Sequence, residues 1–110
     1  MREINIGGKD FRVVASPITL FFYKKEFKRD LLGEMMGFEK MENDVSNFDG
    51  LVILQMAWAM IKTANNGRLE CFEQWLGKLE YVDFEDTQMI LDIVDEAREN
   101  FFRGGEQTQQ

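Results

Sequence analysis

The sequence predicts a mainly α-helical protein with a small N-terminal β-hairpin, an α+β fold with a compact domain of four helices, one of which is central and buried. Three observations support this fold class. The segment 51–61 is apolar around the whole helix circumference, the segment 2–14 alternates between apolar and polar residues, and most other apolar residues recur three or four positions apart. We expect residues 1–103 to form a single globular domain.

The β-hairpin is predicted over residues 2–14, because its apolar residues lie on one side of a two-stranded ribbon. With Gly8-Lys9 at the centre of a two-residue turn, Ile6 would face Phe11 and Ile4 would face Val13. An isolated hairpin is marginally stable in water. We therefore expect its apolar side to pack on a helix.

The first helix is predicted to begin at Ser16-Pro17 and to end near Leu32. Serine is a preferred N-cap residue, and proline is favoured at the first helical position because its missing N–H would be unpaired there in any case. Charged residues cluster in the second half of this helix. The first half should therefore be buried more broadly than the second.

The segment 33–48 has no sustained apolar period, and we predict a mobile connection there, with at most a short turn of helix. It contains two glycines, several carboxylates and three methionines. Loops longer than about 12 residues are uncommon inside compact domains and are often functional.

The central helix is predicted over residues 49–66, where Gln55 is the only polar residue between Leu51 and Ile61. Such a helix must be buried on most sides. The first residues of the run could also form a buried strand, but good helix formers follow them without a turn signal. Asp49 is a suitable N-cap, and an Asn-Asn-Gly sequence provides left-handed residues at the other end. The run is shorter than the ~20 apolar residues that span a bilayer, so we expect no membrane anchor.

Two further helices are predicted toward the C-terminus. The first is short, lies between Leu69 and Leu79, and is weakened at Gly77. The second is capped by Asp83 and ends at the glycine pair that begins at residue 104. We expect the polar tail 104–110 to be disordered.

Composition and charge exclude several classes of function. The formal net charge is −7, with 20 acidic against 13 basic residues, which argues against binding to nucleic acid. The chain has one cysteine, Cys71, and no histidine, so we expect no disulfide, no Cys/His zinc site and no catalytic triad. The N-terminal residues form no apolar signal segment, and we expect a cytoplasmic protein.

No catalytic or cofactor-binding arrangement is evident in the sequence. The carboxylates of Asp83, Glu85 and Asp86 could hold a metal ion, but capping of the last helix explains them better, and the EF-hand spacing is absent. The acids between the apolar positions of that helix are interpreted as its solvated face: Asp92, Asp95, Glu96 and Glu99. Cys71 is interpreted as a partly buried small apolar residue rather than a reactive thiol.

Candidate partner-binding residues are large aromatic side chains and flexible methionines, which suit adaptable apolar surfaces. Trp58 is more easily explained as a core residue, whereas Trp75 lies on a shorter element where both roles remain open. The methionine-bearing segment 35–48 is either a binding surface or a variable solvated loop. The candidates are Trp75, Trp58, Met35, Met36, Phe38 and Met41.

Two sequence strings resemble those of the tail assembly chaperones of long-tailed phages and prophages of Gram-positive bacteria. One is LQMAWAMIKTAN, residues 54–65, followed by FEQWL at residues 72–76, and the other is INIGGKDFRV at residues 4–13. The resemblance covers almost the whole chain. Segment 33–48 matches no motif of the family, and no binding residue is carried over from it.

The resemblance implies a protein without catalytic activity. Such chaperones associate with the tape measure protein, help to load the major tail tube protein around it, and are absent from the finished virion. In many relatives a programmed frameshift adds a C-terminal extension, and the protein sequence leaves open whether one exists here. It also leaves open whether the chain is a homo-oligomer.

The residues themselves allow two hypotheses about partners. An apolar groove beside the central helix, with Trp75 and the segment 35–48 at its rim, could receive helices of a partner while the net charge keeps the complex soluble. Alternatively, an acidic regulatory or inhibitor protein could bind another protein by charge mimicry. The lysines and arginines mixed through the first predicted helix argue against this alternative.

Overall fold

A computed structural model describes residues 1–39 and 49–102 of the chain. It contains a two-stranded antiparallel hairpin, β1 (Arg2–Ile6) and β2 (Lys9–Val13). Within the described residues, five helices follow: α1 (Pro17–Phe27), α2 (Leu31–Glu39), α3 (Gly50–Ala64), α4 (Phe72–Gly77) and α5 (Thr87–Phe101). The predicted fold class, mainly α with an N-terminal hairpin, is confirmed.

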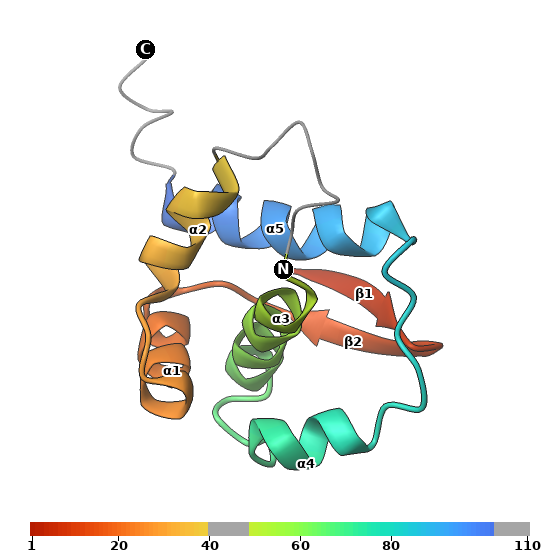
Figure 1. Ribbon diagram of the computed structural model, residues 1–110. Helices are drawn as coiled ribbons and strands as arrows, with labels where there is room; N and C mark the ends of the chain where they lie inside the picture. Colours follow the sequence, from red (N-terminus) through yellow and green to blue (C-terminus); the bar gives the residue numbers. More distant parts are fainter. Residues whose placement is uncertain (40–48, 103–110) are drawn as a thin grey trace.

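Helix α3 runs through the middle of the molecule, as predicted (Figure 1). Every residue from Val52 to Ile61 is buried, including Gln55. Helix α3 contacts α1, β2, α4 and α5, while α5 also contacts β1. In Figure 1, α1 and α2 lie to the left of α3, the hairpin lies to its right, α5 lies above it and α4 lies below it.

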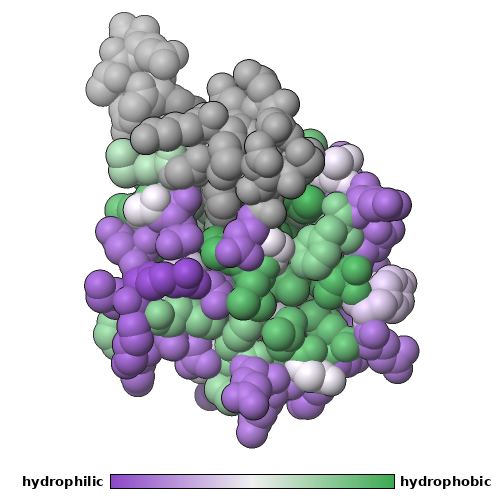
Figure 2. Space-filling view, viewed as in Figure 1, coloured by the Kyte–Doolittle hydropathy of each residue, from purple (hydrophilic) through white to green (hydrophobic). Residues whose placement is uncertain are grey.

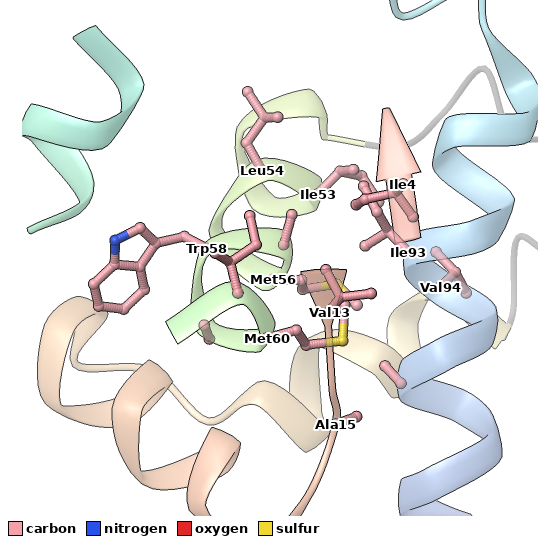
Figure 3. Close-up of a cluster of buried hydrophobic side chains, with 14 of the residues drawn as sticks. Ile4, Val13, Ala15, Ile53, Leu54, Met56, Trp58, Met60, Ile93 and Val94 are labelled. Carbon is pink, nitrogen blue, oxygen red and sulfur yellow. The ribbon is translucent and has the colours of Figure 1, made fainter. Parts of the chain in front are cut away.

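The core around α3 is apolar on two sides (Figure 3). Trp58 points from α3 toward one side, while Met56 and Met60 point toward Val13 and the hairpin side. The side chains of Met56, Trp58 and Met60 are fully buried. Such all-round burial explains why the helix carries apolar residues at positions that a surface helix would leave polar.

Both ends of α3 follow the sequence prediction. The side chain of Asp49 accepts a hydrogen bond from the N–H of Leu51 at 3.0 Å. At the other end, Asn66 and Gly67 have φ values of 59° and 85°, so they supply the left-handed residues, whereas Asn65 does not.

The sequence predicted one helix from Ser16-Pro17 to about Leu32, but the structure divides this segment between two helices. Helix α1 ends at Phe27 because Lys28 adopts a left-handed conformation with φ of 60°, and its N–H donates to the carbonyl oxygen of Lys24 at 2.8 Å. Helix α2 then begins at Leu31. The prediction of a mobile connection is therefore wrong for residues 33–39, and residues 40–48 lie outside the described part of the chain, as does the predicted disordered tail 104–110.

The hairpin turn is centred on Gly7-Gly8 rather than on Gly8-Lys9. Ile6 pairs with Lys9 and Ile4 pairs with Phe11. Both glycines have positive φ values, 62° and 82°, as a two-residue turn of type I′ requires. The pairing differs from the predicted one by two residues, and because side chains alternate with a period of two, the predicted apolar face is kept.

The last helix begins later than predicted. Asp86, not Asp83, is its N-cap residue and accepts a hydrogen bond from the N–H of Met89 at 3.2 Å.

The helices of residues 1–39 and 49–102 include none that is long and apolar enough to cross a membrane.

Glu96 of α5 is buried, with 2% of its surface exposed, which corrects its interpretation as part of a solvated face. Its carboxylate accepts hydrogen bonds from the Nε of Arg2 at 3.0 Å, the N–H of Ala15 at 3.3 Å and the Nδ2 of Asn100 at 3.2 Å. Partial burial lowers the pKa of Arg2, but the hydrogen bond to Glu96 and the charge of Glu99 raise it overall, so the guanidinium stays charged. Glu96 thus joins the start of β1 and the end of the hairpin to α5.

Replacing Glu96 by glutamine should lower the free energy of unfolding by about 2–3 kcal/mol, because it removes the charge that balances Arg2 in a buried site. The control is Glu99→Gln. Glu99 contacts the same guanidinium at 2.8 Å but is 61% exposed. Its replacement should cost less than about 1 kcal/mol. Urea denaturation of the three proteins measures both effects, and equal losses for the two variants would contradict the role of Glu96.

Candidate functional site

Trp58, one of the predicted binding residues, is a core residue. Its ring is fully buried, and its Nε1 donates a hydrogen bond to the carbonyl oxygen of Glu70 at 2.9 Å. The ring packs edge-to-face against Phe27 with centroids 5.5 Å apart. Trp58 therefore presents no surface to a partner in this structure.

Trp75 also lies in the core, with 3% of its surface exposed, rather than at the rim of a groove. Its ring packs edge-to-face against Phe11 with centroids 5.7 Å apart. Its Nε1 is buried without a hydrogen-bond partner among the described residues. Because Phe11 belongs to the hairpin, Trp75 connects α4 to β2 rather than to solvent.

The methionine candidates divide between the core and the surface. Met35 is buried, whereas Met36 is 59% exposed on α2. The side chain of Phe38 and the whole of Met41 lie outside the described part of the structure. The described candidates are therefore not brought together into one site.

A different apolar surface lies at the N-terminal end of α3. It is formed by Leu51, Tyr81 and Phe84, which are 50%, 59% and 44% exposed. Figure 2 shows hydrophobic residues gathered over α3 and the hairpin, with hydrophilic residues at the border. Leu51, Tyr81 and Phe84, with the acids that flank them, are named the acidic apolar patch.

Two backbone contacts hold the patch in place. The ring of Phe84 lies against Gly50, where an added Cβ would be 2.8 Å from its Cζ. Tyr81 packs on the hairpin turn, where a Cβ on Gly8 would be 3.2 Å from its hydroxyl oxygen and a Cβ on Gly7 would collide with its carbonyl oxygen. The Nζ of Lys9 also donates to the carbonyl oxygen of Lys78 at 3.3 Å. The segment 78–84 thus connects the hairpin turn to the first residue of α3.

The border of the patch is acidic. The segment 79–86 contains four acids and no basic residue. Asp49, at the start of α3, is exposed next to the glycine that Phe84 covers. Three of the acids also accept local backbone hydrogen bonds, which fixes their positions without neutralising their charge. The acids of the border are Asp49, Glu80, Asp83, Glu85 and Asp86.

The sequence analysis missed this patch because its members belong to different elements. Phe84 stands between two acids, a sign of exposure that the sequence does carry, but only the fold brings it to Gly50. Leu51 belongs to an apolar run, and only the structure shows that its first residue is exposed while the following ten are buried.

The described residues include no group of three or more Cys, Asp or Glu residues placed to hold a metal ion. Burial, opposed in part by Arg29, raises the pKa of Tyr23 to about 12, so this hydroxyl stays protonated at neutral pH. The Tyr23 hydroxyl donates to Gln55 at 3.3 Å, and Arg29 donates to the same oxygen.

Cys71 is exposed at the start of α4, which corrects its predicted partial burial.

Comparison of the chain with protein-family models, curated proteins and solved structures found no match.

Replacing Gly7 by alanine should lower the free energy of unfolding by about 2 kcal/mol or more, because φ of 62° is unfavourable for residues with a Cβ and the new methyl would meet the backbone of Tyr81. Gly33→Ala is the matched control, since nothing lies within 4 Å of its added Cβ. Gly33 lies in α2, so its replacement should raise the stability by up to about 1 kcal/mol. Thermal and urea unfolding measure the difference. Equal effects at both positions would contradict the close approach of Tyr81 to the turn.

Proposed function

We propose that this protein is a tail assembly chaperone that binds helical segments of a tape measure protein and assists assembly of the tail tube, without catalysis. The observation that carries the proposal is the combination of a family-like central helix with an exposed apolar patch on an acidic protein. The string that resembles the family, residues 54–65, lies in α3 and the start of its C-terminal turn.

The acidic apolar patch is the surface proposed to meet the partner. A long helical protein exposes apolar stripes until it is assembled, and such stripes aggregate in water. Leu51 and Phe84 could bury part of such a stripe against the N-terminal end of α3. The charge of −7 would keep the complex soluble by mutual repulsion between complexes.

The acidic inhibitor is the alternative, and the pairing of charges on α5 weighs against it. Charge mimicry requires carboxylates that face solvent without neighbouring bases. On α5, however, Arg2 contacts Glu96 at 3.0 Å, Glu99 at 2.8 Å and Asp92 at 3.8 Å. These pairs neutralise part of the most acidic helix, so an apolar binding mode is favoured.

Co-expression with a candidate tape measure protein, sought as a long helical product of a neighbouring gene, tests the proposal. The partner should become soluble and co-purify with the chain, also at high salt, because apolar contacts are not screened by ions. A partner that stays insoluble with the wild-type chain would overturn the chaperone function.

Two matched variants test the patch. Phe84→Ser should reduce the recovery of soluble partner severalfold, because it removes the largest apolar side chain of the patch. Leu91→Ser is the control, since Leu91 is 40% exposed on α5, compared with 44% for Phe84 in the patch. Circular dichroism checks that both variants fold. If both variants recover the partner equally, the chaperone function stands and the patch is not its binding surface.

A further inference from the structure

Helix α4 covers aromatic side chains that belong to three other elements. The ring of Phe72 packs edge-to-face on Phe27, with centroids 5.1 Å apart, and its centroid is 6.5 Å from that of Trp58. The ring of Trp75 packs on Phe11. The rings under α4 come from β2, α1 and α3, and they are named the aromatic floor: Phe11, Phe27 and Trp58.

Helix α4 is too short to be stable without this contact. It contains six residues, and isolated helices shorter than about 12 residues are at best marginal in water. Irregular segments flank it on both sides, at residues 65–71 and 78–86, and it lies at the lower edge of the molecule in Figure 1. The folding of α4 therefore depends on its docking to the rest of the protein.

Two hydrogen bonds join residues 69–77 to the rest of the described structure. The N–H of Phe72 donates to the carboxylate of Glu26 on α1 at 2.9 Å. The Nε1 of Trp58 on α3 donates to the carbonyl oxygen of Glu70 at 2.9 Å. Both bonds lie at the N-terminal side of α4, so its C-terminal side is held by apolar packing.

The docked position of α4 is destabilised at Trp75. This side chain is 3% exposed, and its Nε1 has no hydrogen-bond partner among the described residues. A buried donor without a partner costs free energy, because the same group would be hydrogen-bonded in water. This cost is present while α4 is docked and is relieved when α4 leaves.

The segment that carries α4 can move without the elements on either side of it. Gly67, with φ of 85°, precedes the segment, and Gly77 is the last residue of α4. Glycines at these two places can absorb a change of backbone direction. The chain beyond them stays attached, because the Nζ of Lys9 holds the carbonyl oxygen of Lys78 at 3.3 Å and Tyr81 packs on the hairpin turn.

We propose that α4 is a displaceable cover and that the aromatic floor binds a helical segment of a partner protein. The partner segment presents two large apolar side chains at the spacing of Phe72 and Trp75, three positions apart on one side of α4, because these two rings show what fits the floor. A partner with phenylalanine or leucine at the second position fills the site without burying an unpaired donor. The inference goes beyond the function proposed above, and it can fail while that function stands, since the aromatic floor and the acidic apolar patch share no residue.

Native-state hydrogen exchange, measured by NMR, tests the displacement. The backbone N–H groups of Phe72 and Trp75 and the indole N–H of Trp58 should have similar protection, at least about tenfold below that of the buried backbone of α3, because they are released together. The indole of Trp58 is the sharpest readout, since its ring is fully buried but its acceptor belongs to the segment that moves. Protection equal to that of α3 would overturn the proposal, because α4 would then open only when the whole molecule unfolds.

Two variants at Glu26 separate displacement from general loss of stability. Glu26→Ala removes the acceptor of the Phe72 N–H without changing the floor, so it should lower the protection of α4 and of the Trp58 indole by about fivefold and leave α3 unchanged. Glu26→Gln is the matched control, because its amide oxygen can still accept the bond, and it should have a smaller effect. An equal loss of protection in α3 and α4 would contradict an independent movement of α4.

A helix-constrained peptide tests the binding site. The probe is a lactam-bridged peptide with the sequence of residues 70–79 and the substitution Trp75→Phe, and the control peptide carries Phe72→Ser and Trp75→Ser. The probe should bind and shift the NMR signal of the Trp58 indole, whereas the control peptide should not bind below about 1 mM. Equal binding of the two peptides, or no binding of the probe below about 1 mM, would overturn the proposal.

The Glu26→Ala variant links the two measurements. Because the probe binds only when α4 has left, its affinity should rise by the same factor by which the protection of α4 falls. An unchanged affinity would place the peptide on another surface and overturn the proposed site. Sedimentation velocity identifies the occupant: if Glu26→Ala associates with itself more strongly than the wild type, the α4 segment of a second copy occupies the floor, and the proposal of a partner helix is wrong.

Discussion

The rest of the structure depends on the need to cover α3 on every side. Ten consecutive residues of this helix are buried, and the polar residue among them, Gln55, is hydrogen-bonded to Tyr23 and Arg29. Four other elements pack against it: α1, the hairpin through β2, α4 and α5. Many side chains of the 110-residue chain pack against this one helix. Few residues therefore remain to pack over the outer faces of the elements that surround it.

The polar interactions of the structure hold the covering elements to one another. The buried carboxylate of Glu96 joins α5 to both ends of the hairpin, and the side chain of Glu26 caps the start of α4 from α1. These groups lie where segments distant in sequence meet, beside apolar contacts such as the edge-to-face packing of Phe27 on Phe72. A charged residue at such a junction gives a defined orientation, because its hydrogen bonds have directions that apolar packing does not have.

The surface that remains is uneven in both polarity and charge. Some of its exposed apolar residues lie near the N-terminal end of α3, beside acids, and others lie on α1, beside lysines. This separation favours a protein that acts by contact with other chains.

The sequence by itself determined the elements whose signal is local. The all-round apolar run, the cap at Asp49 and the alternation of the hairpin predicted α3 and the two strands, because burial and periodicity follow directly from residue order. Only the tertiary structure decided the break at Lys28, the centring of the turn on Gly7-Gly8, and the burial of Trp75 and Glu96. Each of these depends on a residue far away in the chain or on a choice between backbone conformations of similar energy. The acidic apolar patch belongs to the same class, since Phe84 comes to lie against Gly50, the residue before Leu51, only when the segment before α5 folds back over α3.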